Sequence, residues 1–139
     1  MSAIIVGHDG SETSEAAVHE AVRLAQALDA PLHIVVAFKR DGGGQLRIEG
    51  GAWAVGGLEA AEKALADVET KYGTGIDITD SVSEEDPDDA LVHAAERLGA
   101  QMIVVGNRRT QGLSRVLGSV AGAVVRKAPC SVHIAHTTG

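Results

Sequence analysis

The sequence predicts an α/β fold: an open, doubly wound sheet of five parallel strands in the order 3-2-1-4-5, with helices on both faces. Short β-branched runs alternate with helix-length amphipathic segments along the chain, a pattern typical of parallel strands joined by right-handed crossovers. Two runs are apolar throughout, as expected for strands covered on both faces. Four or five such units are too few to close a TIM-type barrel. The length of 139 residues fits one domain, and we interpret 1–139 as a single unit.

The strands are predicted from runs of strand length that are rich in β-branched residues. These runs are residues 3–6, 32–38, 76–79, 102–105 and 131–135. The first and fourth are continuously apolar, which favours central positions, whereas the third alternates like an edge strand.

Four helices are predicted between the strands from apolar residues at helical spacing. The first predicted helix begins after Glu12 and ends near Asp29. The other three cover 58–72, 87–98 and 119–127. The third has the clearest boundaries, because Asp86 is a favourable N-cap, Pro87 suits the first helical position and Gly99 is a stop signal.

A glycine-rich stretch at 40–57 separates the second strand from the second helix. Connections longer than about 12 residues in compact domains are usually lids, binding loops or disordered tips. We therefore predict a mobile loop there.

Composition excludes several classes of function. Twelve Lys and Arg against nineteen Asp and Glu give a formal charge of -7, which disfavours nucleic acid as a partner. Only three aromatic residues are present, too few for a single-strand stacking surface. The single Cys130 cannot form an internal disulfide, and we interpret it as a buried apolar residue. No run is long enough to span a membrane and no export signal is visible, so we expect a cytoplasmic protein.

Two predicted strand ends carry residues suited to phosphate. Gly7 to Ser11 follows the first strand, and Gly106 to Val120 follows the fourth. Glycines let backbone N–H groups approach an anion, and the following helix adds free donors at its first turn. Ser119 adds a hydroxyl, and Arg108, Arg109 and Arg115 add positive charge. Neither the P-loop pattern nor the dinucleotide GxGxxG pattern occurs.

Each of these residues also has a purely structural interpretation. Asp9 could bind ribose hydroxyls or a divalent cation, or it could simply cap the first helix. The arginines could be solvated surface charge, and His8, with no visible partner, is more often incidental than functional. The acidic run at 84–89 lacks the EF-hand spacing, so we interpret it as helix capping.

The segments VGHDGSETSEAAVHEAVRLA, EEDPDDAL, VVGNRRTQGLSRVLGSV and APCSVHIAH resemble the universal stress protein family. The resemblance implies a five-stranded parallel sheet, a homodimer formed through the last strand, and, in one branch, ATP or AMP bound by the pattern G-x2-G-x9-G-[ST]. Gly106 matches the first glycine, and Gly118 with Ser119 matches the last pair. Arg109 replaces the second glycine, and only eight residues separate it from Gly118.

Carried over by position, the family's nucleotide contacts fall on residues at the ends of strands one, two and four and at the start of the last helix. Asp9 would make polar contacts to the ribose or on the phosphate side, and Val36 or Ala37 would contact the base. The sugar and phosphates would contact Val105, Gly106, Arg108, Gly118, Ser119 and Val120. Arg109 either blocks the phosphate-binding loop or binds the phosphate with its positive charge.

We therefore expect a stress-response sensor that binds ATP, AMP or cyclic AMP, with Mg²⁺ accompanying ATP. We expect no enzymatic activity beyond slow ATP hydrolysis, because no general base is evident. The alternative is a dimeric interaction module of the same fold that has lost nucleotide binding. A fragment of a flavin or dinucleotide redox protein is a weaker third hypothesis.

Overall fold

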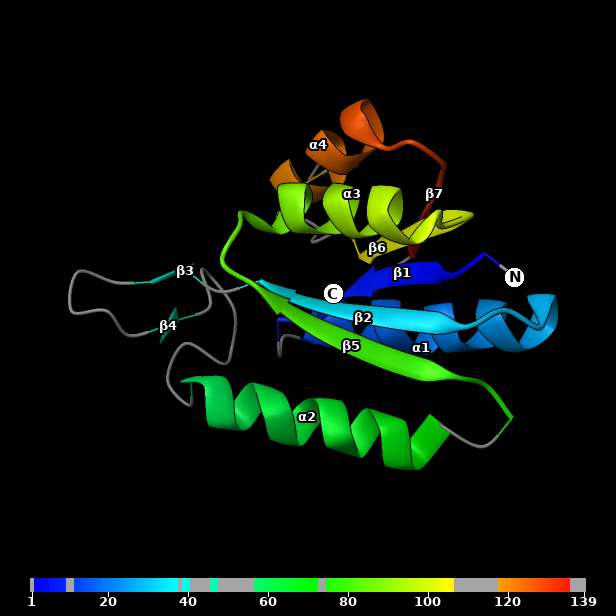
Figure 1. Ribbon diagram of the computed structural model, residues 1–139, viewed down its shortest axis with the longest axis horizontal. Coiled ribbons are helices and arrows are strands. Elements are labelled where there is room, and N and C mark those ends of the chain that lie inside the picture. Colours follow the sequence, from blue (N-terminus) through cyan, green and yellow to red (C-terminus); the bar gives the residue numbers. More distant parts are fainter. Residues whose placement is uncertain are drawn as a thin grey trace, which may run out of the picture.

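The computed structural model describes residues 2–9, 12–37, 39–40, 46–47, 57–72, 75–106 and 118–135. Five parallel strands form its main sheet (Figure 1): β1 (Ile4–Gly7), β2 (Leu32–Ala37), β5 (Ile78–Ser83), β6 (Met102–Gly106) and β7 (Ser131–Ala135). Their order across the sheet is β5-β2-β1-β6-β7. Counted along the chain as five parallel strands, this order is 3-2-1-4-5, which confirms the predicted topology.

Two further strands were not predicted. β3 (Lys39–Arg40) and β4 (Leu46–Arg47) pair antiparallel, and β4 lies within the glycine-rich stretch at 40–57. Most of that stretch lies outside the described residues, so the predicted mobility of the loop stays a prediction.

The third predicted strand is displaced toward the C-terminus. It was predicted at 76–79, whereas β5 spans Ile78–Ser83. Sequence pattern failed here because Asp80 and the serines after it interrupt the apolar run. An edge strand tolerates such residues, since its outer side and one face meet water.

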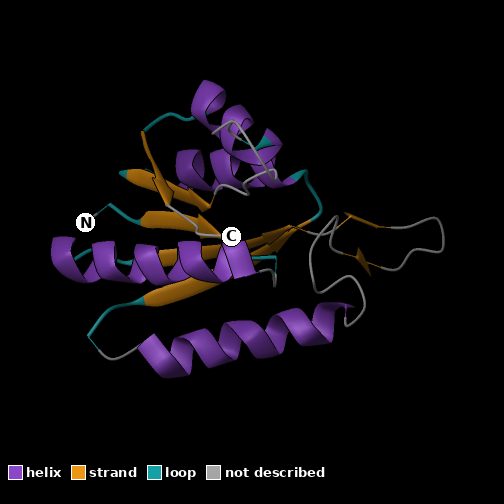
Figure 2. Ribbon diagram, turned by 180° about the vertical axis from the view of Figure 1, so that it is seen from behind, coloured by secondary structure: helices purple, strands orange, loops and turns teal. Residues whose placement is uncertain are grey.

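The four predicted helices are present: α1 (Glu12–Leu28), α2 (Gly57–Tyr72), α3 (Pro87–Leu98) and α4 (Ser119–Lys127). α1 and α2 lie on one face of the sheet, and α3 and α4 on the other (Figures 1 and 2). In the described part of the chain, no helix combines the length and apolarity needed to cross a bilayer.

The two faces of the sheet carry two separate apolar cores, because successive residues of a strand point to opposite sides. On β1, Ile4 and Val6 belong to the core under α1, whereas Ile5 belongs to the core under α3 and α4. All three side chains are fully buried. The central strand is thus fixed from both sides, and its carboxyl end is held firmly in place.

Candidate functional site

The predicted site residues on or just after β1, β2 and β6 lie at the carboxyl ends of these strands. β1 lies between β2 and β6, so the ends of these three parallel strands are neighbours. Asp9 follows β1, Ala37 ends β2 and Gly106 ends β6. In a doubly wound sheet, ligands bind at this edge, where connections diverge to opposite faces.

The turn from β1 to α1 is fixed by a small hydrogen-bond network. The Ser14 hydroxyl lies 3.0 Å from Nδ1 of His8 and accepts the Asp9 N–H at 3.2 Å. The backbone N–H of His8 donates to the Val35 carbonyl at 3.0 Å, which extends the pairing of β1 with β2 by one residue. Asp9 lies three residues before Glu12, where α1 begins, so it does not occupy the N-cap position just before the helix.

His8 is a buried histidine, with a relative exposure of 5%. Burial lowers the pKa of its imidazole below the usual 6.5, and the nearby Asp9 charge acts in the opposite direction. The neutral form of the ring is therefore favoured at pH 7, and a neutral imidazole has one donor and one acceptor nitrogen.

Gly106 is required by packing against α1. A Cβ atom at this position would lie 2.8 Å from Cγ2 of Thr13 and 2.9 Å from the Thr13 carbonyl oxygen. The first turn of α1 therefore sits directly against the end of β6. The sequence predicted an anion-binding or a purely structural role for this glycine, and the structure adds close packing against α1 as a reason for it.

The predicted contacts on β2 and β6 are mainly backbone groups. The side chains of Val36 and Val105 are buried in opposite cores, and that of Ala37 is half-buried. Val36 and Val105 thus cannot present their side chains at this edge and could contribute only N–H and C=O groups to a ligand.

α4 begins at the predicted position, with Ser119 as its first residue. Gly118 is the N-cap in an extended conformation, and its carbonyl accepts the Gly122 N–H at 2.8 Å. Ser119 is exposed, and Val120 packs against the core beneath α3 and α4. The first turn of a helix has N–H groups without helical partners, which suits an anion. Arg108, Arg109 and Arg115 lie outside the described residues.

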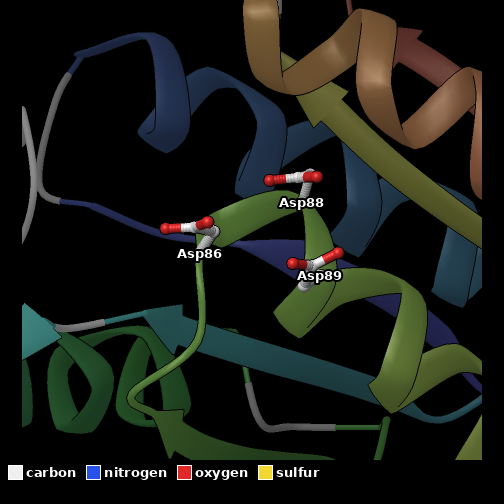
Figure 3. A group of neighbouring side chains, drawn as sticks. All are labelled: Asp86, Asp88 and Asp89. Carbon is white, nitrogen blue, oxygen red and sulfur yellow. The ribbon is translucent and has the colours of Figure 1, made fainter.

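Three carboxylates lie together at the start of α3 (Figure 3). One carboxylate oxygen from each of Asp86, Asp88 and Asp89 lies within 4.8 Å of the others. Lys127 of α4 donates to Asp88 at 2.5 Å and to Asp89 at 2.9 Å. The Lys127 ammonium is the main cause of a lowered Asp88 pKa, and backbone N–H groups add to it. Asp86 occupies the N-cap position as predicted, yet its side chain makes no capping hydrogen bond.

Two residues of this edge were missed by the sequence reasoning. Thr13 packs against Gly106, and Ser14 joins His8 to Asp9. The available signal was weak, because a hydroxyl residue in the first turn of a helix is common. His8 was judged more often incidental for lack of a partner, and that partner is Ser14.

A family model described as the universal stress protein family matches residues 1–136. The chain belongs to the universal stress protein family. Universal stress protein Rv1636 of Mycobacterium tuberculosis is 33% identical to it over 141 residues, covering 97% of this chain and 96% of the relative. Nearly the whole length of this family member is therefore comparable with its relatives.

Solved structures of universal stress proteins share the fold. One, in complex with cAMP, has a TM-score of 0.73 and 30% identity, covering 99% of this chain and 98% of that chain. An Arabidopsis thaliana protein of the family with AMP bound has a TM-score of 0.68, covering 100% and 94%. Its identity of 15% shows a common fold alone.

Proposed function

We propose that this universal stress protein is a small cytoplasmic sensor that binds an adenine nucleotide: ATP, AMP or cyclic AMP. The observation that carries the proposal is that the ends of β1, β2 and β6 lie side by side at one edge of the sheet, with α4 the next helix along the chain after β6. The relative that is 30% identical and was solved with cAMP supports the choice of ligand. A cytoplasmic location fits, because adenine nucleotides are abundant there.

The proposed contacts divide between side chains and backbone. Asp9 accepts hydrogen bonds from the ribose, and Val36 or Ala37 meets the base through backbone groups. The phosphates lie against Gly106 and the first turn of α4. The full set adds Val105, Gly118, Ser119, Val120, Arg108 and Arg109. Mg²⁺ accompanies ATP when ATP is the ligand.

The proposal assigns no catalytic residue. Rapid phosphoryl transfer needs a positioned nucleophile and metal-bound phosphates. Asp9 is the single carboxylate that we place in the site, and we give it a binding role. Hydrolysis of bound ATP is therefore expected to be slow at most.

The first experiment identifies any nucleotide released from the denatured protein and then titrates ATP, AMP and cyclic AMP by calorimetry. Ser119→Asp should abolish binding, because it places a carboxylate against the phosphates at the start of α4. Ser2→Asp is the matched control, since Ser2 is also exposed but precedes β1, at the amino ends of the strands. An unchanged affinity for nucleotide in Ser119→Asp would contradict the site assignment.

A second candidate function rests on Arg109, which replaces a glycine of the family pattern in a loop one residue short. Under this alternative the chain binds no nucleotide and acts as a dimeric interaction module. Arg109→Gly separates the two functions. A higher affinity for nucleotide would show that the arginine blocks the phosphate-binding loop, and a lower affinity would show that it binds the phosphate. No binding by either protein would favour the interaction module.

A further inference from the structure

His8 and Ser14 form a link between the buried sheet and Asp9. The Ser14 hydroxyl touches two groups at once, Nδ1 of His8 at 3.0 Å and the backbone N–H of Asp9 at 3.2 Å. Because one side-chain oxygen serves both, the position of the Asp9 backbone depends on how that hydroxyl is oriented.

Both ends of this link are anchored. The backbone N–H of His8 donates to the Val35 carbonyl of β2, and the imidazole ring of His8 is buried. Ser14 lies in the first turn of α1, and its neighbour Thr13 rests against the backbone of Gly106. The hydroxyl therefore has little freedom to move away from either partner.

The available donors and acceptors limit how the protons are arranged at this contact. The Asp9 N–H can only donate, so the Ser14 oxygen accepts there. The hydroxyl has one proton of its own, and a neutral imidazole offers one acceptor nitrogen. The contact between His8 and Ser14 forms either when the Ser14 O–H donates to Nδ1, with the ring proton on Nε2, or when Nδ1–H donates to the second lone pair of the Ser14 oxygen. We assign the first arrangement, and the protonation of Nδ1 distinguishes the two.

We propose that His8 and Ser14 are positioning residues that hold Asp9 in place for nucleotide binding. The inference rests on the proposed function, and its structural half can be measured without any ligand. His8, in the Nε2–H form, orients the Ser14 hydroxyl, and the hydroxyl fixes the Asp9 backbone. The Asp9 carboxylate is then presented at the end of β1 without a further ordering cost when the ligand binds.

The ligand-free test uses nitrogen-15 NMR and amide hydrogen exchange. At pH 7.5, Nδ1 of His8 should show the shift of an unprotonated acceptor and Nε2 that of a protonated nitrogen. His8→Leu and Ser14→Ala should each speed exchange of the Asp9 amide, whereas exchange at Ile5 stays unchanged. His8→Asn should restore slow exchange, because its amide oxygen can accept from Ser14. A protonated Nδ1, or an Asp9 amide indifferent to His8→Leu, would overturn the inference.

The binding test measures affinity for cyclic AMP and AMP in the same variants. His8→Leu and Ser14→Ala should each weaken binding by about fivefold to tenfold, the effect of losing one hydrogen bond. The double variant should be no worse than either single one, because both break the same link. His8→Asn should recover most of the affinity, and His19→Leu, on the exposed face of α1, is the matched control.

The two failures are distinguishable. If the unaltered protein binds no nucleotide, the proposed function falls, and with it the binding half of this inference. If it binds and the His8 and Ser14 variants bind equally well, the positioning role alone is wrong.

Discussion

At the scale of single residues, two glycines at neighbouring strand ends are expected to tolerate a methyl group very differently. A Cβ at Gly106 would lie 2.9 Å from the Thr13 carbonyl oxygen, a backbone atom that cannot turn away. At Gly7 the nearest atom is a Leu91 methyl at 3.4 Å, an ordinary contact. Gly106→Ala should therefore lower the free energy of unfolding by about 1–3 kcal/mol, and Gly7→Ala by much less.

Urea denaturation of both variants measures this difference. Adding Thr13→Ala to Gly106→Ala should recover only part of the loss, because it removes the side-chain clash at 2.8 Å but leaves the carbonyl oxygen in place. Equal stability of the Gly106 and Gly7 variants would mean that α1 shifts freely, contrary to the packing described above.

His33 is expected to make stability depend on pH. Its ring contacts two hydroxyls of β5, Thr79 at 2.7 Å and Ser81 at 2.9 Å. Burial and then the Arg97 charge lower its pKa below 6.5, and Asp80 acts against them. The unfolded chain therefore takes up a proton more readily than the folded protein. Stability from this group is present above about pH 6.5 and is lost as the pH falls through the folded pKa.

The measurement compares the slope of unfolding free energy against pH, between about 5 and 7, in the unaltered protein and in His33→Asn. The slope should be smaller in the variant, and a residual slope is expected from buried His8. His93 gives the opposite sign, because its bond to Glu85 raises its pKa. Its contribution is present at low pH and lost as the pH rises, so His93→Gln should steepen the slope. An unchanged slope in His33→Asn would contradict the assignment.

Residue chemistry was predicted only where it is local in sequence. Gly106, Gly118 and Asp9 were proposed as site residues from their neighbours along the chain, and their binding roles stay predictions. The contacts of His33 depend on the register of β2 with β5, which pairs His33 with Thr79. No spacing in the sequence reveals such a pair, because 46 residues separate its members.

At the scale of elements, the glycine that ends α3 is expected to contribute measurably to stability. Gly99 has a φ of 59°, in the left-handed region, and nothing would touch a Cβ built there. Gly99→Ala should therefore cost about 1 kcal/mol through backbone strain alone. Asp29, after α1, is the matched comparison for Gly99, because it has a φ of 51° and its backbone is already strained by carrying a side chain.

Thermal unfolding of Gly99→Ala, Gly99→Asn and Asp29→Gly measures this term. Asparagine should be tolerated better than alanine at 99, because it adopts left-handed conformations more readily. Asp29→Gly should be neutral or slightly stabilising. A Gly99→Ala protein as stable as the parent would show that the helix ends equally well in another conformation.

Elements with caps and strong periodicity were predicted most closely. α3 matches its predicted span because Pro87 and Gly99 mark both ends chemically. β5 does not, because an edge strand is defined by its pairing with β2 rather than by its own apolar pattern. The small β3 and β4 pair was missed for the same reason, since two-residue strands carry no periodicity.

At the scale of the whole molecule, the alternation of strands and helices together with the family resemblance predicts the order of the strands in the sheet. That order, with helices on both faces, accounts for the two apolar cores. The last strand was predicted as a dimer edge from the family resemblance alone, because the residue pattern by itself does not distinguish the two outer strands. Both β5 and β7 are edges of the described sheet. β5 carries Asp80 midway, and α2 lies beside it (Figure 1), whereas the exposed residues of β7, Ser131 and Ile134, are uncharged. Charge on an edge opposes strand pairing, which favours β7 as the dimer edge.

The homodimer predicted through the last strand should therefore depend on Ile134. Its side chain is 38% exposed, whereas Val132 packs against the core beneath α3 and α4, so a lysine at 132 would disturb the fold itself. Ile134→Lys should shift sedimentation in the ultracentrifuge from dimer to monomer with little change in the unfolding midpoint. Val125→Lys is the control and should remain dimeric, because Val125 is also exposed, at 47%, but lies on α4. A dimer that survives Ile134→Lys would place the interface elsewhere, and an unaltered protein that sediments as a monomer would remove the dimer from the proposal.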